Sequence, residues 1–147
     1  MMEKPSLDLI IGRAVSHTWF GDYSSLHLEL GKLTPSWRKD GTAGNPKGEI
    51  TLYAGFGWRV ERPRSILGGS KSERTQWSVL AKKFEGATVQ SVEMTGRLPE
   101  LLVGLSNGLT LVTFNAYRGQ PDWTISFRKL GLGHLCVKNG RLSHDQR

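Results

Sequence analysis

Residues 98–114, LPELLVGLSNGLTLVTF, contain the pattern that decides the fold class of this chain. Apolar residues alternate with other residues in 101–105 and again in 109–111, and the pair Asn107-Gly108 separates the two runs. Asn and Gly tolerate the positive φ angles that both central residues of a two-residue hairpin turn require. The stretch therefore predicts a β-hairpin in which each strand has one apolar face.

Further strands are predicted where the same period of two recurs. The segment LHLEL places three leucines on one face and His27 with Glu29 on the other, as in a half-buried antiparallel strand. Trp58 and Arg59 fall on opposite faces of their segment for the same reason. The predicted strands are residues 26–30, 49–54, 56–61, 64–67, 88–94, 123–127 and 135–137. Residues 7–11 are either a strand or one helical turn, and the polar tail 141–147 is expected to fray.

One segment changes from a period of two to a helical period. Its apolar residues fall at positions i, i+3, i+4 and i+7, namely Trp77, Leu80, Ala81 and Phe84. Ser70 followed by Glu73 fits a capping box at its start, and Gly86 can end it. We expect one amphipathic helix over about 71–84.

The parts of the chain before and after this helix resemble each other. Gly12 and Trp58 in residues 12–70 have counterparts in Gly86 and Trp123 of residues 86–140. An internal duplication would give two similar antiparallel sheets with the helix bridging them. We therefore expect a single, mainly β domain over 1–147, built as an antiparallel sandwich or partly closed barrel of about eight strands.

The overall charge favours acidic partners. Twenty Lys and Arg against thirteen Asp and Glu give a formal charge of +7, which attracts nucleic acid, an acidic protein or an anionic surface. The single cysteine, Cys136, excludes an internal disulfide and is expected to be a buried thiol within an apolar run. The sequence has neither a signal-peptide pattern nor a run long enough to span a membrane, so we expect a cytoplasmic protein with no membrane partner.

Residues 32–48 form the longest stretch without a secondary-structure period. Such a length is uncommon for a structureless connection and indicates either a mobile insertion or a binding element. The loop contains one aromatic residue, Trp37, followed by Arg38 and Lys39. Trp37 is either an anchor tucked under the loop or, together with the two cations, a contact for a partner.

Two other groups of cations are candidate binding residues. Arg59, Arg62 and Arg64 lie near aromatic residues, as in protein interfaces and grooves for single-stranded nucleic acid, although alternation places Trp58 in the core. Lys71 and Arg74 lie at the predicted start of the helix and could hold an anion there. A plain turn before a helix is the alternative for this second group.

No pattern predicts catalysis, a cofactor or a metal. The four histidines, His17, His27, His134 and His144, lack the spacing of a ligand pair, and no carboxylate cluster accompanies them. His27 and Glu29 imitate the His-x-Glu of zinc deaminases, but the cysteine pair of that motif is absent. We therefore assign no catalytic residue, cofactor or metal ligand.

Several segments together resemble a family of short, uncharacterised bacterial proteins. They are LHLELGKLT (26–34), GEI (48–50), WRVE (58–61), SILGGS (65–70), GRLPELLVGLSNGL (96–109), DWTI (122–125) and VKNGRL (137–142). The resemblance extends over about residues 9–142. It implies a bacterial origin and a compact β-rich domain, and it transfers no catalytic residue because the family has no assigned activity.

These observations lead to three functional hypotheses. The first is a non-enzymatic domain that binds an acidic protein partner, as an immunity protein or an inhibitor of a toxin or effector does. The second is nucleic-acid binding by a β face carrying Arg59, Arg62 and Arg64. The third is an enzyme whose catalytic residues converge only in space. The sequence leaves the partner and the oligomeric state undetermined.

Overall fold

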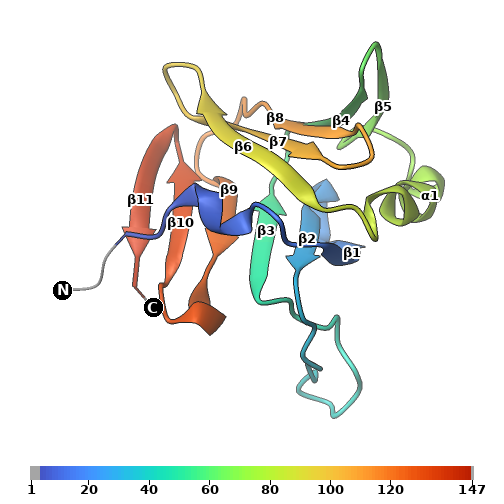
Figure 1. Cartoon of the computed structure of the whole chain (residues 1–147), viewed down its shortest axis with the longest axis vertical. Coiled ribbons are helices and arrows are strands. Elements are labelled where there is room, and N and C mark those ends of the chain that lie inside the picture. The colour runs from blue at the N-terminus through green and yellow to red at the C-terminus, as the bar shows by residue number, and fades with distance from the viewer. Residues whose placement is uncertain (1–3, 147) are drawn as a thin grey trace.

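Residues 4–146 are described by the computed structural model, and two antiparallel sheets make up most of them (Figure 1). The strands are β1 (Val15–Phe20), β2 (Leu26–Leu30), β3 (Ile50–Ala54), β4 (Trp58–Arg62), β5 (Ser65–Gly69), β6 (Val89–Thr95), β7 (Glu100–Leu105), β8 (Thr110–Thr113), β9 (Pro121–Ser126), β10 (His134–Lys138) and β11 (Arg141–Asp145). The helical elements are α1 (Arg74–Phe84) and the short 3-10 turns η1 (Leu7–Ile10), η2 (Asp22–Ser24) and η3 (Arg128–Leu130).

The two sheets are stacked as layers. The first has the strand order β1-β2-β3-β9-β10-β11 and the second has β5-β4-β8-β7-β6. In Figure 1 the strands of the second sheet run across those of the first, as in an orthogonally packed sandwich. The predicted antiparallel sandwich is confirmed. Within residues 4–146 neither sheet closes into a barrel, and there are eleven strands where about eight were expected.

The last strand corrects the expectation of a fraying tail. Asn139 and Gly140 both have positive φ, +53° and +76°, which makes the tight hairpin turn between β10 and β11. Strand β11 then pairs along the whole of β10. The sequence pattern did not predict this strand, because an exposed edge strand needs few apolar residues and therefore shows no clear apolar alternation. The final residue, Arg147, lies outside the described part of the chain.

The hairpin of residues 98–114 is confirmed as β7 and β8, although its turn differs from the prediction. Gly108 has φ +85°, but Asn107 is not among the residues with positive φ. The Leu105 amide instead donates to the Leu109 carbonyl at 2.8 Å, so the loop is one residue longer than expected. The Asn107 side chain is free to donate to the Lys83 carbonyl at 2.7 Å, which ties the hairpin to the end of α1.

Helix α1 packs its predicted stripe against the sandwich. Trp77, Leu80 and Phe84 are buried, and α1 contacts both β1 and β5, so it bridges one edge of each sheet. The helix begins at Arg74 rather than near residue 71. The capping box is wrong, because Glu73 is the N-cap and its side chain makes no capping hydrogen bond.

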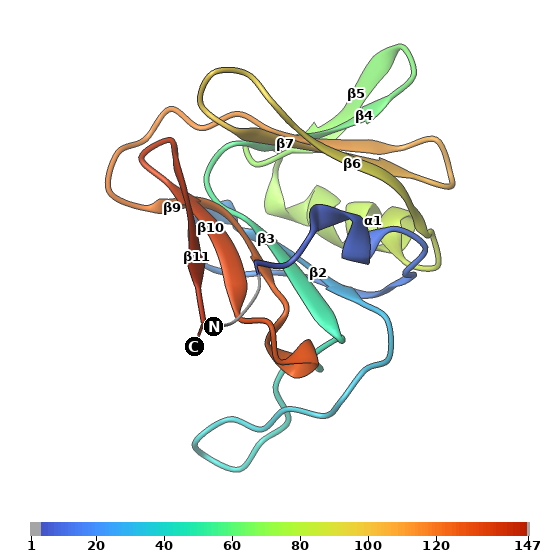
Figure 2. The same cartoon turned by 60° about the vertical axis from the view of Figure 1, so that its left-hand side comes forward.

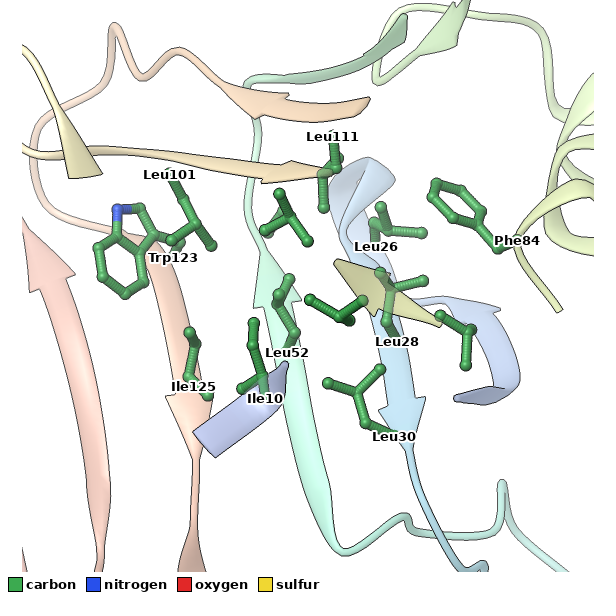
Figure 3. Close-up of a cluster of buried hydrophobic side chains, with 14 of the residues drawn as sticks. Ile10, Leu26, Leu28, Leu30, Leu52, Phe84, Leu101, Leu111, Trp123 and Ile125 are labelled. Carbon is green, nitrogen blue, oxygen red and sulfur yellow. The ribbon is translucent and has the colours of Figure 1, made fainter. Parts of the chain in front are cut away.

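The core lies between the two sheets, and Figure 3 shows side chains from both sheets and from η1 converging on it. Leu26, Leu28, Leu101 and Trp123 are all fully buried. The alternation that predicted these strands therefore marks the faces that meet. Cys136 was expected to be buried, but it is partly exposed because its neighbours along β10 occupy the inward positions.

The halves of the chain exchange strands. Strands β1, β2 and β3 form one side of the first sheet, and β4 crosses to the second sheet to pair with β8. Likewise β6, β7 and β8 precede β9, which crosses back to pair with β3. This strand order is what a duplication of 12–70 and 86–140 would give, and the duplication itself stays a prediction.

Matching hydrogen bonds occur at equivalent places in the two halves. The Gly12 amide donates to the Val89 carbonyl at 2.8 Å, and the Gly86 amide donates to the Val15 carbonyl at 2.9 Å. These bonds join the start of β1 to the start of β6. Similarly, the indole N–H of Trp58 donates to the Ser24 carbonyl at 2.7 Å, and that of Trp123 donates to the Pro99 carbonyl at 3.1 Å.

These indole hydrogen bonds can be tested by substitution. Trp58→Phe removes the donor and leaves the Ser24 carbonyl without this partner, so we expect it to lower the free energy of unfolding by about 1–3 kcal/mol. Trp37→Phe, at an exposed position, should change it by less than about 0.5 kcal/mol. Urea denaturation of the two variants measures the difference, and equal effects would contradict the role assigned to the indole.

Candidate functional site

The long loop before β3 folds back on itself. Isolated bridges join Thr34 to Lys47 and Trp37 to Ala43, so the two arms of the loop pair like an irregular hairpin. In Figures 1 and 2 the loop projects from the end of β2 and β3, away from the second sheet. Backbone hydrogen bonds therefore order a segment whose sequence shows no period.

Side chains at the tip of the loop fix its shape. The Arg38 guanidinium donates to the Ala43 carbonyl and lies 3.4 Å from the Thr42 hydroxyl. The Asp40 carboxylate accepts from the Thr42 hydroxyl at 2.6 Å and from its amide at 3.0 Å, and these bonds lower the pKa of Asp40. Trp37 is left 69% exposed, so its interpretation as an anchor under the loop is wrong.

Glu29 holds the base of the loop against the first sheet. Its carboxylate is fully buried and accepts from the Trp19 indole at 2.9 Å, the Gly48 amide at 3.0 Å and the Thr51 hydroxyl. The Lys47 ammonium lies 3.9 Å from it. Alternation correctly predicted that Glu29 lies on the face of β2 away from the core leucines. The second arm of the loop covers that face and therefore buries the Glu29 carboxylate.

His27 lies beside this anchor. Its ring stacks on Trp19 with centroids 3.6 Å apart and meets the ring of Tyr53 edge-on at 5.2 Å. Burial, reinforced by the nearby charge of Lys47 and opposed by that of Glu29, lowers the pKa of His27 to about 4. The imidazole is therefore neutral at pH 7 and belongs to the packing between loop and sheet.

A second basic segment meets the loop. Lys47 and Glu49 line a cleft of about 280 Å³ together with Arg128 and Lys129 of η3, and the Lys129 ammonium lies 3.4 Å from the Lys47 carbonyl. Glu49 is already engaged, because it pairs with Arg13 at 3.0 Å and accepts from the Lys32 amide, which lowers its pKa. Sequence reasoning missed this convergence, since about eighty residues separate the two segments.

We call residues 31–49 and η3 together the basic end. They contain six cationic side chains against two carboxylates, an excess of four positive charges in one region of the molecule. The cations are Lys32, Arg38, Lys39, Lys47, Arg128 and Lys129.

The other predicted arginines are far from the basic end. Arg62 and Arg64 flank the turn between β4 and β5, which lies at the opposite end of the molecule in Figure 1. Arg59 forms an ion pair with Glu61 at 2.7 Å, and Trp58 beside it is buried, so this face has no free tryptophan on which a base could stack. The structure thus places the candidate residues of the long loop and those of β4 and the turn after it in separate regions of the molecule.

Lys71 and Arg74 have different surroundings at the helix start, and anion binding by them stays a prediction. Arg74 lies over the ring of Trp77 at 5.7 Å, whereas Lys71 is in the preceding turn and lines a cleft with Phe56. In that turn the Ser72 hydroxyl accepts from the Gly69 amide at 3.0 Å.

The histidines are engaged in local contacts. His17 lies 3.0 Å from the Asn45 side chain, His144 lies 2.9 Å from the Leu132 carbonyl, and His134 lies 3.7 Å from Asp145. Among residues 4–146 no group of three or more His, Cys, Asp and Glu side chains is arranged to hold a metal ion. The same part of the chain contains no helix long and apolar enough to cross a membrane.

Comparisons of this chain with protein-family models, with curated proteins and with solved structures found no match.

The anchoring role of Glu29 leads to a stability prediction. Glu29→Gln replaces one acceptor oxygen with an NH₂ donor, which then faces the donors of Trp19, Gly48 and Thr51. We therefore expect the variant to lower the free energy of unfolding by about 2–4 kcal/mol and to make loop 31–49 sensitive to protease. Glu93→Gln, on an exposed position of β6, should change neither property. Unfolding and limited proteolysis measure both effects, and an intact loop in Glu29→Gln would contradict the role.

The lowered pKa of His27 predicts a pH dependence. Between about pH 6.5 and pH 4 the unfolded chain takes up a proton at this imidazole and the folded chain does not, so stability is present at pH 7 and is lost as pH falls. The loss should be at most about 3 kcal/mol. His27→Gln should reduce the difference in unfolding free energy between pH 7 and pH 4.5, and an unchanged difference would contradict the assignment.

Proposed function

We propose that the protein is a cytoplasmic, non-enzymatic bacterial domain that binds an acidic protein partner, of the kind formed by an immunity protein or inhibitor with its toxin or effector. The main observation in favour of the proposal is that Trp37 is exposed on a hydrogen-bonded loop within the basic end.

Trp37 has the properties of an interface anchor. Tryptophan and arginine are enriched among the residues that contribute most to binding energy at protein interfaces. A tryptophan that is 69% exposed leaves a large apolar area in water, which a partner can cover. The hydrogen bonds of Arg38 and Asp40 order the loop before binding, so the loop loses less conformational entropy when a partner binds.

The charge of the basic end favours an acidic partner. Its excess of four positive charges accounts for more than half of the formal charge of +7, so the electrostatic field of the molecule is uneven. Such a patch accelerates encounter with an acidic surface and disfavours basic competitors. Nucleic acid shares the negative charge, but Trp37 is one isolated ring rather than the series of rings on which successive bases stack.

The test is recovery of a complex from the cells that make the protein. Immobilised protein should retain an acidic protein in stoichiometric amount at low salt, and the yield should fall as salt is raised, because the steering charges are screened. Trp37→Ala and the double variant Lys39→Glu/Lys129→Glu should each abolish retention. The recovered protein should lose its own activity on complex formation.

Two matched variants control for general effects of surface change. Val79→Ala removes an exposed apolar side chain and Lys82→Glu reverses an exposed charge, both on α1, and both should retain the partner. Retention that disappears after nuclease treatment, or that depends on Arg62 and Arg64 instead of Trp37, would contradict the proposal. A complex that leaves the partner's activity unchanged would contradict the inhibitory role.

A further inference from the structure

A second surface, which the sequence did not reveal, lies where three loops meet at the other end of β3. Phe56 contacts Tyr23 edge-on at 5.7 Å and Tyr117 edge-on at 5.0 Å, and Phe114 lies close by. Tyr23, Phe114 and Tyr117 are 78%, 74% and 49% exposed. We call these four aromatic residues and the clefts between them the aromatic groove.

The groove consists of three clefts that share Tyr117. The central cleft has a volume of about 480 Å³, and its walls include Phe56, Phe114 and Val112. A cleft of about 330 Å³ beside Tyr23 shares Phe56, Lys71 and Tyr117 with it, and one of about 310 Å³ shares Glu100, Ala116 and Tyr117 with it. The two smaller clefts have only Tyr117 in common. The central volume is within the range of ligand-binding sites, and the row of clefts suits an extended chain better than a single compact molecule.

The backbone holds these rings in place. The Phe114 amide donates to the Gly57 carbonyl at 2.9 Å, and a Cβ atom on Gly57 would lie 1.8 Å from the Phe114 carbonyl oxygen, so only glycine allows this approach. The Glu100 carboxylate accepts from Thr113 at 2.7 Å and from the Asn115 amide at 2.9 Å, which fixes the segment that carries Phe114.

Tyr23 is held in an unfavourable backbone conformation. Tyr23 and Ser24 have φ of +58° and +66°, which side-chain-bearing residues rarely adopt. The Trp58 indole bonds to the Ser24 carbonyl and fixes this turn from below. Conformations of this kind cluster at binding sites, where the surrounding structure maintains them.

Charges of both signs line the groove, and Lys71 is a cation among them that has no ion-pair partner among the described residues. Lys71 lines the central cleft and the cleft beside Tyr23, it is exposed, and it makes no ion pair within residues 4–146. Arg59 and Glu100 also line the central cleft, but Arg59 pairs with Glu61 at 2.7 Å and Glu100 accepts from Thr113 and Asn115. Arg118 lines the third cleft together with Glu100 and Asp122, and burial raises the pKa of Asp122. A negative charge beside Lys71 therefore complements a ligand that places an apolar group in the central cleft.

We propose that the aromatic groove binds an extended, acidic segment of a partner polypeptide, with an aromatic side chain in the central cleft and a carboxylate beside Lys71. The ordered rings reduce the entropy that the groove loses on binding. Loop 31–49 enters β3 and Phe56 follows β3, so the groove and the basic end lie at opposite ends of that strand. This proposal therefore does not depend on the one made for Trp37.

The test is an NMR titration of ¹⁵N-labelled protein with a short blocked peptide, Asp-Glu-Trp-Glu. We expect amide shifts that cluster at Gly57, Lys71, Ala116 and Tyr117. The peptides Asp-Glu-Ala-Glu and Lys-Lys-Trp-Lys should each bind at least about tenfold more weakly, because one lacks the ring and the other the negative charge.

Variants separate binding in the groove from general attraction between charges. Phe114→Ala/Tyr117→Ala and Lys71→Glu should each weaken binding of the acidic peptide at least about tenfold, and Lys71→Glu should raise affinity for the lysine peptide. Lys82→Glu and Trp37→Ala, which retain the groove, should bind as the unaltered protein does. All of these positions are exposed, so thermal unfolding should confirm that each variant folds.

Three results would overturn the proposal. They are the absence of shifts at millimolar peptide, shifts confined to residues 31–49, and an equal loss in Lys71→Glu and Lys82→Glu. Stronger shifts of the same amides by a single-stranded oligonucleotide than by the peptide would reassign the groove to nucleic acid. Failure of either of these experiments would leave the Trp37 proposal standing, because that proposal is tested by different variants and a different partner.

Discussion

The exchange of strands between the two halves is the constraint on which the rest of the structure depends. Each sheet has three strands from one half and its remaining strands from the other, so neither sheet is complete until both halves are present. The bonds between Gly12 and Val89 and between Gly86 and Val15 join the sheets where their edge strands begin. Burial of the facing apolar side chains then stabilises both layers together, which is why one core forms instead of two.

In this architecture both candidate surfaces lie in connections between strands. The connection between β2 and β3 is ordered by a buried carboxylate, Glu29, and by pairing of its own arms, rather than by an apolar core. The connections beside η2, β4 and β8 are ordered by close backbone contact and by the Trp58 indole. In both places, rigid loops hold exposed aromatic side chains that would otherwise be expected to turn inward.

The two candidate surfaces differ in the physical basis of recognition. The recognition that we propose for the basic end depends on charge, which extends beyond direct contact and varies with ionic strength. The recognition that we propose for the aromatic groove depends on shape and apolar area, with one short-range charge contributed by Lys71. Because they lie at opposite ends of β3, a partner of ordinary interface size can cover one without covering the other.

The sequence by itself determined the fold class, most strands, the stripe of α1 and the burial of Trp58, because side-chain direction along a strand or helix is a local property. It also identified Trp37, Arg38 and Lys39 as candidate contacts. Only the tertiary structure decided that β11 pairs, that Glu29 is buried, that Lys47 meets η3 and that Tyr23, Phe56, Phe114 and Tyr117 form a groove. These features depend on strand order and on which loops return over a face, and neither leaves a periodic signal in the segments that they bring together.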